Sequence, residues 1–374
     1  MSDRRKVFGE NKNELLMKEP LLLRREPMKN SNLLLIITIS VFAFLYIISV
    51  IFGAVGVINF TKGYLSLNTF INLFNNYAYL IIIACGLSIV MISGGIDISV
   101  AAVANLVCMA CAVTLKDNGF NVIGALVLSL GIGLAFGALQ GFLVSYLKIQ
   151  PFIVTLAGMF MARGLTRLIS TVGVSSATND AFMGLSQFRI NLGAAELTFG
   201  FLVMVVVVAV IFAVLRWTRF GRNVYAVGGN SQNALTLGIN VNRTKFYSFM
   251  VCGLLAGLAG FVYIVHRPGA SPSGLQGHEM NAIAACIIGG VLLTGGVGNV
   301  LGSMFGVLIL GTIYLMIPSL GLNTYWQGIL VGIMLLIFIV LQSIILGYRN
   351  RKQQGNADDS IFKKIILRLR NRNV

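Results

Sequence analysis

The stretch LIIIACGLSIVMISGGIDISVAAVANLVCMACAVTL, from Leu80 to Leu115, decides the fold. It is predominantly apolar except at SGGIDIS, where Gly94, Gly95 and Asp97 interrupt it. A bilayer-crossing helix needs about 20 predominantly apolar residues, so the stretch is long enough for two crossings. Glycine pairs inside apolar runs are also typical of broken or re-entrant helices, which membranes tolerate where protein covers them. The stretch therefore predicts two helices of a membrane protein on either side of a break.

The rest of the chain has the same character. Of its 374 residues, 57% are hydrophobic and 11% are charged, and its mean hydropathy is +0.86. Ordinary soluble domains carry about 25% charged residues, so a water-soluble globular protein is excluded. We predict an all-α polytopic membrane protein with about ten spans, some of them broken helices. The candidate spans are Leu33–Gly53, Phe70–Ile92, Ile98–Leu115, Val122–Leu147, Phe152–Thr171, Gly200–Arg216, Phe246–His266, Asn281–Leu293, Val300–Ile317 and Gly328–Leu346.

The position of the positive charge predicts the topology. The net charge is +16, and 21 of the 28 Lys and Arg residues lie in residues 1–30, 216–245 and 348–374. This is the positive-inside pattern of membrane proteins. It accounts for the positive net charge, so we expect no nucleic-acid partner. An even number of spans puts both termini on the cytoplasmic side. We expect a cytoplasmic tail over residues 1–32, a transmembrane domain over 33–347 that contains a cytoplasmic loop at 217–245, and a basic cytoplasmic tail over 348–374.

Several kinds of site are excluded by what the sequence lacks. There is no Walker A sequence, so the chain does not bind ATP through a P-loop. Cys108 and Cys111 form a CxxC pair inside an apolar run, but a structural zinc site needs four ligands, so we expect packing residues and no metal. A polar segment precedes the first apolar run, so we expect no cleaved signal peptide.

Glycine spacing predicts close helix packing. Glycines four residues apart share one helical face, where a second helix can approach closely. They are Gly133, Gly137 and Gly141; Gly253 and Gly257; and Gly298, Gly302 and Gly306. The sequence also contains a possible internal repeat, because CGLSIVMISGG from Cys85 matches CIIGGVLLTGG from Cys286. The span count makes the two copies parallel, whereas one misassigned span would make them inverted; chance similarity between apolar stretches is the other alternative.

Ionisable groups inside a membrane are paired or line a wet path, and few lie inside or beside the predicted spans; we single out four of them. Asp97 either caps the helix that begins at Ile98 or lines a translocation pathway. Arg163 and Arg167 share a helical face and either snorkel, pair with another helix or contact a polar substrate. Glu279 opens a span, where the helix dipole favours an acid and a structural role is the default. All four are candidate pathway residues.

The segment YAVGGNSQNALTLGINVNRTKFYS, from Tyr225 to Ser248, lies in the predicted cytoplasmic loop. It contains the turn-forming pair Gly228-Gly229, a cap-like Asn230 or Ser231, a short run through Leu237 and a stop at Gly238. This pattern predicts one short helix exposed to the cytoplasm. An ordinary cytosolic loop would have the same pattern.

From Phe70 to Gln342 the sequence resembles the ribose-type sugar permeases of the ATP-binding-cassette (ABC) importer superfamily. The motifs that carry the resemblance are SGGIDIS at 93–99, KIQPFIVTLAGMFMARGL at 148–165, TRFGRNVYAVGGNSQNALTLGI at 218–239 and GHEMNAIAACIIGGVLLTGGVGNVLG at 277–302. Within this group TLAGMF, TRFGRNVYAVGGN and LTGGVGNVLGSMFGV look most like a galactofuranose permease. Branched-chain amino-acid permeases are related but lack the GGID motif.

The resemblance implies a permease subunit of an importer in the bacterial inner membrane. Its partners would be a second permease, identical or homologous, an extracytoplasmic sugar-binding protein, and a cytoplasmic ATPase that binds ATP and Mg²⁺. The segment 229–238 would be the coupling helix that docks on the ATPase, with Gly229, Asn230, Ser231, Ala234, Leu235 and Gly238 as its contact residues. The superfamily's Glu-Ala is replaced here by Gln232-Asn233, so we expect docking to rest on shape and apolar contact.

Two other classes of function are weighed against the importer. A proton- or sodium-coupled carrier or channel would need carboxylates at mid-membrane, and Asp97 is the single clear candidate. A membrane enzyme is disfavoured, because GxSxG, HExxH and paired-carboxylate arrangements are absent. We therefore expect a transporter subunit that is not an enzyme. The basic tail adds a possible amphipathic helix from Asp358 to Arg370 on anionic membrane lipid, with a solvated disordered tail as the alternative.

Overall fold

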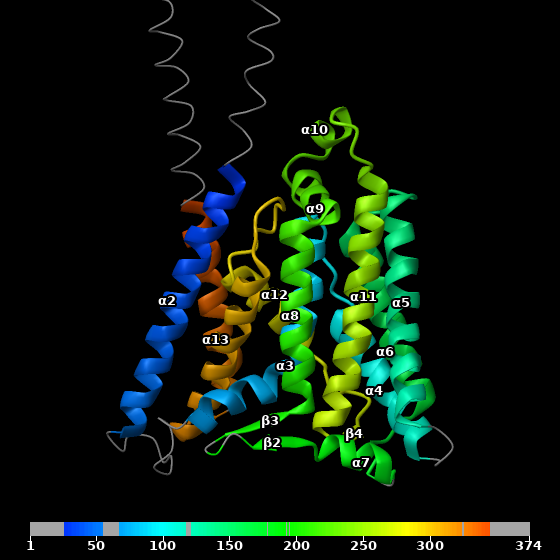
Figure 1. The fold of residues 1–374 in the computed structure, drawn as a ribbon, viewed down its shortest axis with the longest axis vertical. Helices are drawn as coiled ribbons and strands as arrows, with labels where there is room; N and C mark the ends of the chain where they lie inside the picture. Colours follow the sequence, from blue (N-terminus) through cyan, green and yellow to red (C-terminus); the bar gives the residue numbers. More distant parts are fainter. Residues whose placement is uncertain are drawn as a thin grey trace, which may run out of the picture.

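We analysed a computed structural model of the chain, which describes residues 26–54, 67–116, 121–177, 179–191, 193, 195–323 and 325–344. The N-terminal tail before residue 26 and the proposed amphipathic helix at 358–370 lie outside the described residues. The described part is a bundle of long helices, with short helices at one end and small strands at the other (Figure 1).

Each of the ten predicted spans contains a helix of the described residues, and this confirms the all-α polytopic fold. Eight are long and apolar enough to cross a membrane, including α2 (Glu26–Ala54), α3 (Leu67–Ile92) and a last helix over Tyr325–Ile344. The other five of these eight are α5 (Val122–Ser145), α6 (Pro151–Ile169), α8 (Phe199–Trp217), α11 (Val241–His266) and α13 (Val300–Ser319). The remaining two, α4 (Val100–Lys116) and α12 (His278–Ile288), are shorter, with 17 and 11 residues. Helix α4 follows the glycine-rich break at residues 94–95, and α12 precedes the one at residues 295–296.

The two copies of the predicted repeat have the same local shape. In the first copy α3 leads through Gly94 into α4, and in the second copy α12 leads through Gly295 into α13. Gly94 and Gly295, which correspond in the repeat, have φ values of 82° and 83°, a left-handed conformation that favours glycine. Both breaks lie towards the end of the bundle that carries α9 and α10, so the two copies run in the same direction (Figure 1).

Glycine faces bring the helices into close contact, as the spacing predicts. A Cβ built on Gly133 of α5 would lie 2.9 Å from the Cα of Gly257 in α11, and one built on Gly137 would lie 3.1 Å from the Cα of Gly253. A methyl group at either α5 position would collide with the backbone of α11, since real Cβ atoms do not approach other atoms that closely. Helices α5 and α11 therefore pack backbone against backbone.

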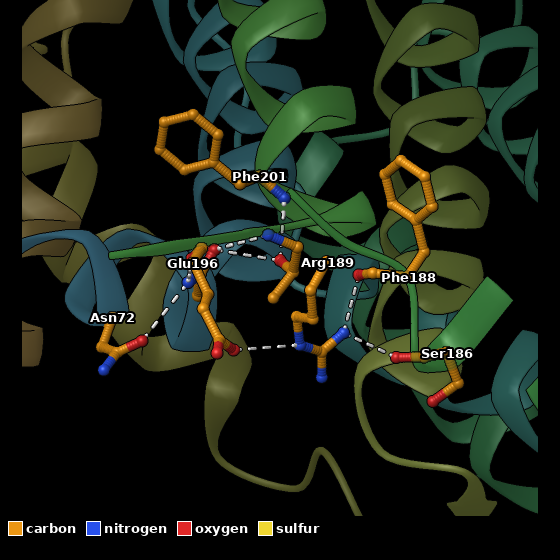
Figure 2. Close-up of polar contacts among 8 residues, drawn as sticks. Asn72, Ser186, Phe188, Arg189, Glu196 and Phe201 are labelled. Atoms are coloured by element: carbon orange, nitrogen blue, oxygen red, sulfur yellow. Dashed lines mark hydrogen bonds and ion pairs between the residues drawn. The ribbon is translucent and has the colours of Figure 1, made fainter. Parts of the chain in front are cut away.

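The opposite end of the bundle is closed by short elements. Strand β1 (Val174–Ser175) pairs with β4 (Gly269–Ala270), and β2 (Arg189–Asn191) pairs with β3 (Glu196–Thr198) beside the short helix α7 (Asp180–Ser186). Figure 2 shows Arg189 bridging this end: its guanidinium donates to the carbonyl of Ser186 at 2.7 Å and its Nε lies 4.0 Å from Glu196. We call this the hairpin end of the bundle.

Candidate functional site

The loop between α8 and α11 folds into two short helices, α9 (Arg219–Gly229) and α10 (Ser231–Thr236). The side chain of Thr218 accepts a hydrogen bond from the N–H of Gly221 and caps α9, and Asn230 accepts from Asn233 at 3.0 Å and caps α10. The sequence correctly predicted the Asn230 cap and the stop at Gly238, whose φ is 78°. It missed α9, and the pair Gly228-Gly229 lies in the last turn of this helix instead of a turn ahead of a helix.

The predicted contact residues of this loop separate into buried and exposed sets. Ala234 is buried and packs with Val227 of α9 and Val241 of α11 in a small apolar cluster. Leu235 is 56% exposed, and Leu237 is 75% exposed. Gly229, Asn230, Ser231 and Gly238 are also exposed. Ala234 therefore holds α10 on the bundle, while the leucines form an apolar tip that is free to contact another protein.

Five glycines from three distant segments of the chain meet at the C-terminal end of α9. We call Gly94, Gly228, Gly229, Gly295 and Gly296 the glycine junction. The N–H of Gly296 donates to the carbonyl of Ile92 at 2.8 Å, and this bond links the second break to the end of α3. A Cβ on Gly295 would lie 2.9 Å from the Cα of Gly94, and a Cβ on Gly296 would lie 2.6 Å from the Cα of Gly229.

Gly228 occupies the centre of this junction. A Cβ built on it would overlap the carbonyl oxygen of Ile92 and lie 2.6 Å from the nitrogen of Gly296. Both atoms belong to the backbone, so they cannot turn aside as the end of a flexible side chain could. The end of α9 therefore touches both breaks of the repeat without an intervening side chain.

A tyrosine fixes the other side of the same contact. The hydroxyl of Tyr225 on α9 donates to the carbonyl of Gly298, just after the second break, at 2.9 Å. Burial raises the pKa of the Tyr225 phenol to about 12, partly offset by Arg216, so the hydroxyl keeps its proton at neutral pH. The sequence alone did not mark Tyr225 as a contact residue.

Arg163 and Glu279 form an ion pair between α6 and α12. Nη2 of Arg163 lies 2.5 Å from Oε1 of Glu279, and their side chains are 28% and 6% exposed. The second carboxylate oxygen, Oε2, is buried and has no hydrogen-bond partner among the described residues. Arg167 is exposed and takes no part in this pair. The pairing with another helix is thus the alternative that the structure shows for Arg163.

Asp97 belongs to a separate buried network. Its Oδ1 accepts from the backbone N–H and the hydroxyl of Ser99 at 2.9 and 2.7 Å, just ahead of α4. The amide of Gln140 on α5 donates to the same hydroxyl at 2.8 Å. Gly158 of α6 packs against that amide, since a Cβ there would collide with it. Asp97 therefore holds the first break against α5 and α6, and its hydrogen bonds within the described residues do not include Arg163 or Glu279.

The remaining polar groups near Glu279 were not found from the sequence. Tyr79 and His278 hydrogen-bond at 3.0 Å, and the hydroxyl of Tyr314 donates to Asn281 at 2.7 Å. These pairs join α3, α12 and α13 towards the hairpin end. Their partners are nearly 200 residues apart in one case, so only the fold brings them together.

The described residues thus form a bundle of membrane-length helices in which two glycine-rich breaks meet the α9–α10 loop. Residues 69–339 match the family described as the permease component of branched-chain amino acid transport systems, and the chain belongs to this family. It is 40% identical to the inner membrane ABC transporter permease protein YjfF of Escherichia coli (strain K12), over 83% of this chain and 92% of that protein.

Two further relatives carry substrate names. The chain is 33% identical to the fructose import permease protein FruG of Bifidobacterium longum (strain NCC 2705), over 78% of this chain and 87% of that protein. It is 32% identical to the ribose import permease protein RbsC of Escherichia coli (strain K12), over 76% and 88%. No solved structure matches the chain. The resemblance to the ribose-type group of ABC permeases is therefore confirmed, whereas these relatives do not single out galactofuranose.

Proposed function

We propose that this chain is the membrane-spanning subunit of an ATP-driven sugar importer, and that the α9–α10 loop is the place where a separate ATPase moves it. The substrate is a monosaccharide of the ribose or galactofuranose kind, delivered by an extracytoplasmic binding protein. The relatives named as ribose and fructose import permeases support the substrate class. The chain acts as a transporter subunit, and ATP and Mg²⁺ bind to the partner ATPase.

The glycine junction is the observation that carries this proposal. An ATPase that binds α10 would also displace α9. Gly228 at the end of α9 contacts the backbone of Ile92, just before the first break, and of Gly296, in the second break. Close-packed backbone contacts transmit displacement with little slack, because no side chain can change rotamer between them. Movement of one loop would therefore reach both halves of the repeat at once and shift them as rigid bodies.

The orientation follows from this role. The cytoplasmic parts are the α9–α10 loop at residues 217–245 and the two tails at 1–32 and 348–374. Residues 33–347 form the permease domain of a bacterial inner membrane protein. Leu235 and Leu237 enter the groove of the ATPase, flanked by Gly229, Asn230, Ser231 and Gly238. The hairpin end faces outward and receives the binding protein. A second permease, identical or homologous, completes the pathway.

The translocation pathway is lined on its outer half by the ion pair. One buried carboxylate oxygen of Glu279 has no hydrogen-bond partner among the described residues, and a sugar hydroxyl could donate a hydrogen bond to it. Arg163 is the partly exposed donor beside it, and Arg167 lies on the same face of α6. Asp97 supports the inner half by holding the first break in place. Such a pathway binds sugar weakly, as suits a subunit loaded by a binding protein.

Uptake by proteoliposomes tests the proposal against a secondary carrier. The permease is reconstituted with its ATPase and binding protein, and uptake of the radiolabelled sugar that the binding protein captures is followed. We expect uptake to require ATP and to be absent when the ATPase is omitted. Uptake driven by a proton gradient without the ATPase would establish the carrier instead.

A further inference from the structure

An apolar groove of about 270 Å³ runs along the side of α8, between α8, α3 and α13. Every side chain that lines it is apolar. The contribution of α8 is a single stripe at intervals of three and four residues, which includes Phe201, Val205, Val208 and Phe212. Phe74 of α3 closes the hairpin end of the groove, in edge-on contact with Phe201 at a ring distance of 6.0 Å. A sugar would find no hydrogen-bonding partner here.

The length of the groove matches one leaflet of a membrane. At a rise of 1.5 Å per residue, the stripe from Phe201 to Phe212 is about 16 Å long. The hydrocarbon core of a bilayer is about 30 Å thick, so one leaflet contributes about 15 Å. Val205 is 46% exposed, so the groove opens sideways towards the membrane and is not sealed within the bundle.

A positively charged side chain lies at the α9 end of the same stripe. Arg216 is the next residue of the stripe after Phe212, is exposed, and holds its guanidinium carbon 6.0 Å from the centre of the Phe212 ring. Trp217 follows it, is 70% exposed, and packs edge-on against Phe212. Trp is enriched at the level of lipid headgroups, and basic residues there attract anionic lipids. The groove thus has an apolar body one leaflet deep and a positively charged end.

We propose that the groove binds one acyl chain of an anionic phospholipid from the leaflet on the α9 side, with the lipid phosphate at Arg216. The apolar lining selects the chain, and the guanidinium selects the charge of the headgroup. The lipid would bridge α3, α8 and α13, and α8 leads directly into α9, so the site adjoins the moving part of the subunit.

Lipid retention measured by native mass spectrometry tests this site. The purified protein is incubated with palmitoyl-oleoyl phosphatidylglycerol or with phosphatidylcholine of the same chains. Ala209 is exposed and lines the groove, so Ala209→Trp places a large ring there. Val206→Trp is the matched control, because Val206 is 61% exposed on the same helix and does not line the groove. Ala209→Leu is a milder filling variant for use if the tryptophan prevents folding.

We expect Ala209→Trp to lower phosphatidylglycerol retention at least about ten-fold, because loss of only two buried CH₂ groups corresponds to that factor. Ala209→Leu should give a smaller loss, and Val206→Trp none. Arg216→Gln should reduce the preference for phosphatidylglycerol over phosphatidylcholine by about five-fold. Equal retention in Ala209→Trp and Val206→Trp, or equal retention of the two lipids by the unmodified protein, would overturn the proposal. So would a disulfide between two copies of Ala209→Cys in membranes, which would make a second copy the occupant.

Discussion

Replacing Gly228 by alanine adds one methyl group at the centre of the glycine junction. That methyl would overlap the carbonyl oxygen of Ile92 and lie 2.6 Å from the nitrogen of Gly296, whereas ordinary contacts begin at 3.4 Å, so α9 must retreat from both atoms. Forcing a methyl into packed backbone costs about 1–3 kcal/mol, and loss of the 2.8 Å bond from Gly296 to Ile92 adds about 1 kcal/mol. If motion passes through this contact, weakening it by about 2 kcal/mol lowers coupled transport about 30-fold.

The neighbouring glycine provides the control for this experiment. A Cβ on Gly229 meets no atom of the described residues within 4 Å, although it belongs to the same turn of α9. ATP-driven sugar uptake and ATPase binding are measured for both variants in proteoliposomes. We expect Gly228→Ala to bind the ATPase normally but to transport about 30-fold more slowly, and Gly229→Ala, whose added methyl group meets no described atom of this chain, to slow transport far less. Equal transport by the two variants would refute the role of the junction.

Three further predictions follow from other contacts. Leu235→Asp places a charge on the exposed tip of α10 and should abolish co-purification with the ATPase while membrane insertion, checked by fractionation, is unchanged. Arg163→Ala leaves the buried carboxylate of Glu279 without its partner, so the detergent-solubilised protein should lose about 1–3 kcal/mol of unfolding free energy. Adding Glu279→Gln to the same protein should partly restore this stability. Sugar uptake by Arg163→Ala should also fall, and unchanged uptake would assign the pair to packing alone. Gly137→Val should separate α5 from α11 and prevent a monodisperse protein from being purified, whereas Gly131→Val, which meets no described atom within 4 Å, should not.

The helices could be predicted from sequence because the bilayer imposes a simple rule. A single segment in hydrocarbon can pair all its backbone N–H and C=O groups only as a helix, so a helix was the one structure open to each apolar run of sufficient length. The same reasoning predicted a helix at α12, which is an apolar run. It also predicted that this helix would be short, because the run has too few residues to cross the membrane alone. Helix α9 was missed because it is amphipathic and carries three arginine or tyrosine residues on an exposed loop, and its terminal glycines look like a turn.

The contacts of the site could not be predicted in the same way. Sequence spacing places Arg163 beside Arg167 on one face, but its partner Glu279 is 116 residues away and comes from another helix. The glycine junction likewise joins three segments whose distance along the chain says nothing of their distance in space. One signal was available: each of these segments contains a Gly-Gly doublet, at 94–95, 228–229 and 295–296, and a close approach of backbones requires such residues.

The side of the membrane on which α10 lies tests the central claim most directly. The five native cysteines are all buried, so a single Leu237→Cys at the exposed tip can be labelled selectively with a membrane-impermeant maleimide. We predict labelling in inside-out vesicles, none in intact spheroplasts, and protection of the cysteine when the ATPase is bound. Labelling from the outside of intact spheroplasts would contradict the account.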